Sequence, residues 1–97
     1  MVYNKNNKFV LRNIHNSFFF IDITDNYADE KLLLTETNEI GAFIWNNLDG
    51  TNTVEDIALK LLEAIIDEIP YNVIFNDVNS CLLELSEKGI VCKESLL

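Results

Sequence analysis

Residues 38–50 read Asn-Glu-Ile-Gly-Ala-Phe-Ile-Trp-Asn-Asn-Leu-Asp-Gly, and they divide the chain into two differently patterned parts. Ile40, Phe43 and Ile44 recur at the i, i+3, i+4 spacing of a helix with one buried face. Asn38 is a suitable N-cap, and Gly50 favours a stop because glycine accepts the left-handed conformation after a helix. The stretch therefore predicts a first helix, with Trp45 as a large core anchor.

The residues after Gly50 continue the helical pattern. A second helix is predicted to open at residues 53–56, a near capping box with Asp56 in place of Glu. Its apolar positions run to Ile66 in a stripe wide enough for contacts on two sides. Pro70 either ends that helix or begins a third, which stops at Lys88-Gly89, and residues 90–92 form a short terminal strand.

The residues before Asn38 follow the pattern of strands. Residues 8–14 predict a first strand, and the following polar residues mark a turn. Residues 17–23 are rich in aromatic and β-branched side chains and predict a second strand, and residues 31–36 predict a third. Together they indicate an antiparallel meander.

The second predicted strand has two apolar faces. Phe19, Ile21 and Ile23 share one face because successive side chains alternate, while Phe18 and Phe20 share the other. One face belongs to the core. The face with Phe18 and Phe20 then needs cover from a helix, a partner or a second copy.

Length and charge narrow the classes of function. The chain has 97 residues, 48% of them hydrophobic, which predicts one domain over residues 1–97. Seven basic side chains stand against 16 acidic ones, a net charge of −9, which disfavours nucleic acid and suits either cationic partners or solubility alone. The absence of a signal-peptide pattern or a long apolar run predicts a cytoplasmic protein.

Catalytic and metal-binding patterns are missing from the sequence. His15, the one histidine, falls in a polar turn, and Cys81 falls on the apolar side of a predicted helix, where cysteine usually packs as a small hydrophobe. Two cysteines and a distant histidine make no zinc site, and three glycines cannot build a phosphate cradle. We therefore predict no catalytic residue, no metal and no cofactor.

Four short motifs, in order, resemble the PqqD-like family, the small precursor-peptide recognition elements of ribosomally synthesised, post-translationally modified peptide pathways. Residues 38–50 resemble its signature, and residues 53–57 its second-helix opening. Asp77-Val78 with the leucines that follow, and residues 87–91, resemble its third helix and its ending. The resemblance spans about residues 8–92, and Thr37 stands where the family usually has Leu.

This resemblance implies an α+β, winged-helix-like fold, with an N-terminal three-stranded antiparallel sheet packed on three helices. It also implies a non-catalytic peptide chaperone that binds a leader segment and presents it to a modifying enzyme. The leader would add as a strand to the edge of the third strand, in a cleft against the third helix, a mode known as β-augmentation.

The resemblance also implies which residues bind the peptide, although the apolar ones among them also suit the core. Asp77, polar on an otherwise apolar helix, is the best polar candidate. The implied strand edge comprises Lys31, Leu32, Leu33, Leu34 and Thr35, and the implied cleft wall comprises Ile74, Asp77, Val78, Cys81 and Leu82.

The implied partners are a precursor peptide and its modifying enzyme. By the same resemblance, the enzyme is first a radical SAM enzyme and next a cyclase or leader peptidase. A homodimer through an exposed strand edge stays open. The alternative class, a winged-helix DNA-binding regulator, is disfavoured because the predicted third helix, residues 71–88, offers one Lys against three acidic side chains.

Overall fold

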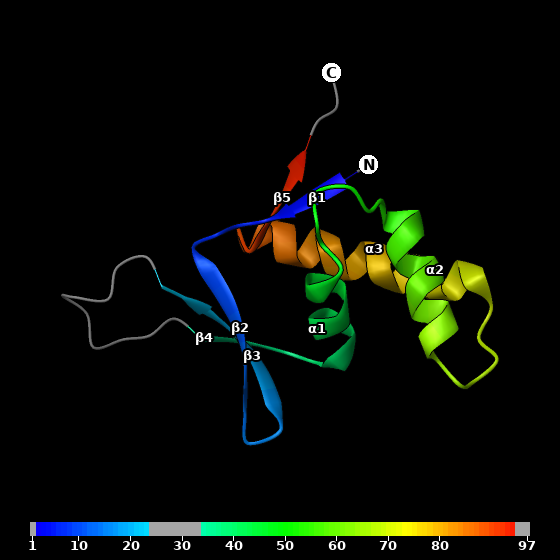
Figure 1. Ribbon diagram of the computed structural model, residues 1–97, viewed down its shortest axis with the longest axis horizontal. Coiled ribbons are helices and arrows are strands. Elements are labelled where there is room, and N and C mark those ends of the chain that lie inside the picture. Colours follow the sequence, from blue (N-terminus) through cyan, green and yellow to red (C-terminus); the bar gives the residue numbers. More distant parts are fainter. Residues whose placement is uncertain (1, 24–33, 95–97) are drawn as a thin grey trace.

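The protein is described here by a computed structural model, which places residues 2–23 and 34–94. The expected order of strands, helices and a terminal strand is present, and one further strand precedes it (Figure 1). The elements are β1 (Val2–Lys5), β2 (Phe9–Ile14), β3 (Ser17–Asp22), β4 (Leu34–Thr37), α1 (Glu39–Asn46), α2 (Val54–Ala64), α3 (Tyr71–Glu87) and β5 (Val91–Glu94).

The predicted meander is a three-stranded antiparallel sheet in the order β2-β3-β4. The turn between β2 and β3 consists of His15 and Asn16, whose φ angles of 51° and 67° match the twist of a two-residue hairpin. In the register of the sheet, Phe20 lies opposite Leu11 on one side and Thr35 on the other. Both β2 and β4 are therefore edge strands of this sheet.

A second, two-stranded sheet joins the two ends of the chain. β1 pairs antiparallel with β5, from Val2 opposite Glu94 to Lys5 opposite Val91 (Figure 1). The sequence predicted β5 but not β1, because β1 is four residues long and half polar. Its pairing partner lies almost the whole chain away, where no local pattern can reveal it.

Helix α1 covers the Phe20 face of the sheet. Asn38 caps the helix as expected, its Oδ1 accepting a hydrogen bond from the Gly41 N–H at 2.9 Å. Phe20 is fully buried and meets Trp45 edge to face, with ring centroids 5.1 Å apart. Of the three covers that the sequence allowed for this face, the structure uses a helix, which makes it the core face. The opposite face, expected to be core, has Phe19 and Ile21 half-buried and Ile23 43% exposed.

The capping box of α2 is present, but the helix ends earlier than predicted. The Asp56 N–H donates to Thr53 Oγ1 at 3.1 Å, and the Thr53 N–H donates back to Asp56 Oδ2 at 3.0 Å. The chain leaves the helix at Ile65, whose ψ of 133° is extended. Ile66 is consequently 99% exposed and does not continue the apolar stripe.

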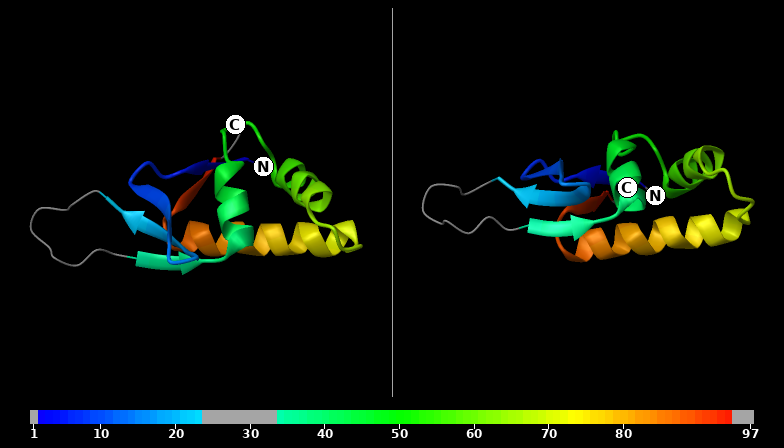
Figure 2. Two further views of the ribbon diagram at one scale, coloured as in Figure 1. Left: turned by 60° about the horizontal axis from the view of Figure 1, so that its bottom comes forward. Right: turned by 90° about the horizontal axis from the view of Figure 1, so that it is seen from below.

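Helix α3 is the longest element, and Pro70 begins it rather than ending α2. It runs along one side of the molecule with α1 and α2 against it (Figure 2). Gly89, at a φ of 75°, turns the chain from α3 into β5, and Ile90 and Val91 are buried directly after it. The buried side chains of α3 are Ile74, Val78, Leu82 and Leu85.

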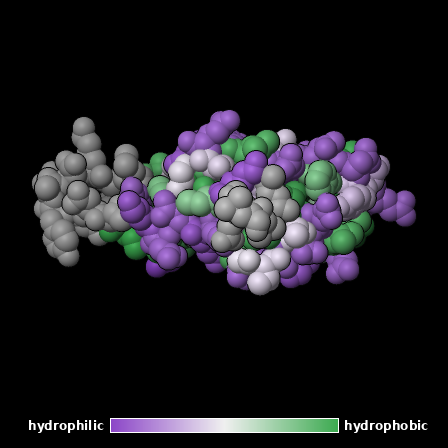
Figure 3. Space-filling model, turned by 90° about the horizontal axis from the view of Figure 1, so that it is seen from above, coloured by the Kyte–Doolittle hydropathy of each residue, from purple (hydrophilic) through white to green (hydrophobic). Residues whose placement is uncertain are grey.

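The surface around this core has a mixed composition. On the face shown in Figure 3, hydrophobic areas are separated by hydrophilic residues. Within the described residues, no helix is long and apolar enough to cross a membrane.

Candidate functional site

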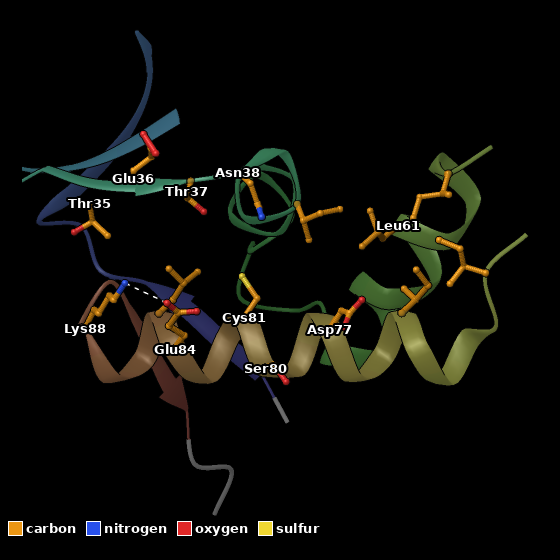
Figure 4. A pocket seen from close by; sticks show the side chains of 15 residues that line it. Thr35, Glu36, Thr37, Asn38, Leu61, Asp77, Ser80, Cys81, Glu84 and Lys88 are labelled. Carbon is orange, nitrogen blue, oxygen red and sulfur yellow. Dashed lines mark hydrogen bonds and ion pairs between the residues drawn. The ribbon is translucent and has the colours of Figure 1, made fainter. Parts of the chain in front are cut away.

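A groove of about 610 Å3 lies where β4 and the three helices meet (Figure 4). One wall is β4 with the start of α1, and α3 forms the facing wall. Its lining residues are Thr35, Glu36, Thr37, Asn38, Ile40, Leu61, Ile65, Ile69, Ile74, Asp77, Ser80, Cys81, Glu84, Leu85 and Lys88.

The two ends of the groove differ in chemistry. Thr35, Glu84 and Lys88 lie at one end, beside β4, whereas Leu61 and Asp77 lie at the other (Figure 4). Ile65 follows Leu61 by one helical turn, and Ile74 precedes Asp77 by one turn, so the Leu61 end is also the aliphatic end. A ligand that fills the groove therefore meets a polar strand edge and then an apolar recess.

The edge of β4 that faces away from β3 has backbone groups available for pairing. The two-residue turn makes Ile14 and Ser17 a hydrogen-bonded pair, and pairs alternate along an antiparallel ladder. By this alternation, Phe20 makes no hydrogen bonds to β2 and is hydrogen-bonded to Thr35 on β4 instead. The N–H and C=O of the neighbouring residues Leu34 and Glu36 therefore point to the outer edge. Within the described part of the chain, no strand pairs with this edge.

The charge of the groove is predominantly negative. Among the described residues, the carboxylates of Asp77 and Glu84 face it against the single ammonium group of Lys88, whereas the Glu36 side chain points away from α3 (Figure 4). Lys88 Nζ lies 3.3 Å from Glu84 Oε1, but both side chains are exposed, so this ion pair contributes little to stability. The side chains that face the groove thus carry a net charge of about −1 at neutral pH, which favours a ligand with basic side chains.

Cys81 is a half-buried thiol in the wall of the groove. Burial raises its pKa, and the nearby Glu84 carboxylate raises it further. The sulfur therefore stays protonated near neutral pH, the form that is a poor nucleophile. His15 lies in the hairpin turn, and no cluster within residues 2–23 and 34–94 could hold a metal ion.

The residues implied by the family resemblance fall into four groups in the structure. Thr35, Ile74, Asp77 and Cys81 line the groove. Leu34 lies in β4 and is 50% exposed, but it does not line the groove. Val78 and Leu82 do not form the wall as expected, because they occupy the other face of α3 and are fully buried in the core. Lys31, Leu32 and Leu33 lie outside the described residues.

The sequence did not identify the lining that comes from α1, α2 and the α2–α3 connection. These residues are Ile40, Leu61, Ile65 and Ile69, and the wide stripe of α2, with contacts on two sides, was the one signal for them. Glu84 and Lys88 were also missed, although they follow Asp77 and Cys81 at helical spacing on the exposed side of α3.

Three comparisons with known proteins bear on this fold. A family model described as coenzyme PQQ synthesis protein D (PqqD) matches residues 30–91, well over half of the chain. No curated protein sequence matches. The structure of TbiB1 in complex with the TbiA(beta) leader peptide superposes with a TM-score of 0.71 at 13% identity, covering 96% of this chain and 99% of that one.

A second solved structure agrees equally well. Lasso peptide synthetase B1 complexed with the leader peptide superposes with a TM-score of 0.72 at 14% identity, covering 96% of this chain and 100% of that one. At these identities the likeness is one of fold. The expected α+β architecture, a three-stranded antiparallel sheet on three helices, is confirmed.

Proposed function

This chain belongs to the PqqD family, and from that premise we propose that it is a peptide-recognition protein. It binds the leader segment of a ribosomally made precursor peptide and presents that segment to a modifying enzyme. The two solved structures that share its fold are, by their descriptions, complexes with leader peptides.

The observation that carries this proposal is the edge of β4 beside the groove, which no strand within the described residues pairs with. Leu34 and Glu36 present their backbone groups outward, toward the space that α3 borders. An extended peptide placed there becomes a fourth strand, and its main chain pairs with β4. Its alternate side chains face the groove wall, which gives the peptide's sequence a means of selection.

The proposed contacts follow from the lining of the groove. The peptide backbone pairs with Leu34 and Glu36, and its inward side chains meet Thr35, Ile74, Asp77 and Cys81. Val78 and Leu82 support this wall from the core side of α3. The strand residues implied before these, Lys31, Leu32 and Leu33, stay predictions from the sequence.

Electrostatics define the kind of peptide that suits the groove. Because the side chains that face the groove carry a net charge of about −1, a leader with basic side chains near Asp77 and Glu84 gains attraction. This attraction acts between exposed groups and is screened by salt. Binding should therefore weaken as ionic strength rises.

A non-catalytic role suits the described chemistry better than an enzymatic one. The only thiol in the groove is held protonated by burial and by Glu84. The alternative of DNA recognition by α3 is not favoured, because Asp77 and Glu84 line its groove side and its single nearby cation, Lys88, is paired to Glu84. No cofactor is required for β-augmentation.

The modifying enzyme is the second proposed partner. Family resemblance gives a radical SAM enzyme as the first expectation, and a cyclase or leader peptidase as the next. A homodimer through the β4 edge would compete with the leader for the same backbone groups, so we propose that the peptide-binding form is not a dimer through β4.

The test is calorimetric titration with the leader encoded by a short reading frame beside the gene for a peptide-modifying enzyme. Glu36→Pro removes an outward N–H from β4 while sparing the ladder to β3. One lost backbone hydrogen bond contributes about 0.5–1.5 kcal/mol, so we expect about 2- to 13-fold weaker binding.

Two control variants separate the strand edge from other effects. Glu36→Gln removes the charge and keeps the N–H. Asn13→Pro places proline at an outward position of the opposite edge strand, β2. Circular dichroism checks that each variant is folded. Equal affinity for Glu36→Pro and the wild-type protein would refute pairing at β4, and an equal loss in Asn13→Pro would assign the loss to general destabilisation.

A further inference from the structure

The second edge of the same sheet, strand β2, carries a charge opposite in sign to that of the groove. We infer that the edge of β2 binds an extended acidic segment of a second protein, in the hollow between β2 and the end of α1. This site is distinct from the proposed leader groove, and its occupancy does not depend on a peptide at β4.

Strand β2 is an edge strand with outward backbone groups available for pairing, although the Leu11 carbonyl already accepts a hydrogen bond from Arg12 Nη1. It pairs only with β3 in the part of the chain that the structure describes. Because Ile14 and Ser17 are a hydrogen-bonded pair, alternation turns the N–H and C=O of Leu11 and Asn13 away from β3. The Ile23 N–H donates to the Lys8 carbonyl at 2.8 Å, as the same alternation along the two strands requires.

A hollow of about 460 Å3 lies along this edge. It extends from the end of β1 at Lys5, along β2, to the last turn of α1 at Trp45 and Asn46. An added strand would therefore have both a backbone edge to pair with and space for its side chains, the two requirements of β-augmentation.

Of the residues that the structure describes, two cations line this hollow and no carboxylate does. Lys5 Nζ lies over the Trp45 ring, 5.2 Å from its centroid, a cation–π arrangement that holds the ammonium group beside the edge. Arg12 is exposed, and its Nη1 donates to the Leu11 carbonyl at 2.9 Å. Among the described residues, neither Lys5 nor Arg12 forms an ion pair with a carboxylate.

The charge distribution of the chain singles out this edge. Residues 1–21 carry three cations, Lys5, Lys8 and Arg12, and no acidic side chain, whereas residues 22–97 carry 16 acidic side chains against four lysines. The hollow is thus a cationic surface on an acidic protein. An acidic segment is attracted to it, while the rest of the molecule repels nucleic acid.

The same charge argues against a second copy as the occupant. Two β2 strands paired antiparallel would bring the cations of both copies to one edge, and like charges across a strand pair are destabilising. An acidic strand from another protein has no such penalty. With β2 and β4 at opposite edges of one sheet, both partners can be bound at once.

The experiment uses two blocked peptides, one with glutamate alternating with valine and one with lysine alternating with valine. Each is titrated at low salt into the 15N-labelled full chain, and amide and indole shifts are followed by NMR. We expect the acidic peptide to shift the amides of Leu11 and Asn13 and the indole of Trp45, while the basic peptide leaves them unchanged.

Variants test the edge and the charge separately. Asn13→Pro should weaken binding of the acidic peptide about 2- to 13-fold, the effect of one lost backbone hydrogen bond. Arg12→Glu should weaken it roughly 2- to 30-fold, since an attractive exposed pair becomes a repulsive one. Lys60→Glu, on the exposed side of α2, changes the net charge equally and should have no effect.

The outcomes that overturn the inference are specific. They are the absence of shifts at β2, shifts at β4 instead, or an equal loss of affinity in Lys60→Glu and Arg12→Glu. A dimer in sedimentation that Asn13→Pro dissociates would assign the edge to a second copy and also refute it. Glu36→Pro should retain binding of the acidic peptide, so failure of the leader proposal and failure of this one are distinguishable.

Discussion

The junction of β4 and α1 has room for glycine but not for alanine. A Cβ built on Gly41 would overlap Thr37 Oγ1 and lie 3.2 Å from Thr37 Cβ. Gly41 is buried in the first turns of α1, so the added methyl cannot move into solvent. We predict that Gly41→Ala destabilises the protein, although alanine is the better helix former.

The expected magnitude comes from two opposing effects. Alanine in place of glycine favours a helix by up to about 1 kcal/mol. Overpacking a close contact costs about 1–3 kcal/mol. The single variant should therefore lose up to about 2 kcal/mol of unfolding free energy. Thr37→Ala removes the overlapping oxygen and leaves only the contact with Cβ. Gly41→Ala should then be tolerated, with a coupling energy of about 1–2 kcal/mol between the two sites.

The assay is urea denaturation of the wild-type protein, both single variants and the double variant, followed by tryptophan fluorescence. Trp45 lies in the same helix and is buried, so it reports the transition. If the two substitutions were additive within about 0.3–0.5 kcal/mol, Thr37 would simply rotate out of the way. The close approach of strand and helix would then not be the reason for glycine.

Three further predictions concern the core, the acid range and the thiols. Phe20→Ala should cost about 3–5 kcal/mol in urea denaturation, because the fully buried ring packs edge to face on Trp45; a loss below about 1 kcal/mol would contradict that packing. Hydrogen bonds from the Thr51 and Asn52 backbone and the Thr51 hydroxyl lower the pKa of Asp49 from 3.8 to about 2. The carboxylate thus stabilises the fold above about pH 4, and that stabilisation is lost as the pH falls toward 2. Urea midpoints of the wild-type protein and Asp49→Asn should therefore converge between pH 5 and pH 2.5, and a constant difference would be inconsistent with the shift. Cys92, which is exposed, should react with iodoacetamide faster than Cys81, whose pKa is raised by burial; equal rates by mass spectrometry would show an open thiol.

Much of the helical half of the fold could be predicted because its signals are local. Asn38 and Thr53 accept the N–H groups that each helix start leaves unpaired, and both caps are present in the structure. Gly89 takes the left-handed conformation that ends α3. Each of these cues acts within about four residues, which is the range that a sequence pattern displays directly.

The sequence predictions are wrong where contacts between distant residues determine whether an element forms and where it ends. β1 forms only because β5 returns to pair with it from the other end of the chain. In the sequence, the apolar stripe of the second helix extends to Ile66. In the structure, the chain leaves α2 before that residue, and Ile66 is exposed. Periodicity shows that a segment is apolar, but it does not show where the packing partners stop.

For the candidate site, the sequence by itself determined that a short apolar strand and a third helix exist, and its family resemblance implied that Asp77 and Cys81 belong to the peptide-binding side of that helix. The tertiary structure alone decided that Val78 and Leu82 face the core and that residues from α1 and α2 close the aliphatic end. It also decided that Glu36 offers its backbone groups outward, because register across three strands sets that phase. Local pattern specifies which face of an element is apolar, but the packing of elements determines which surfaces remain open.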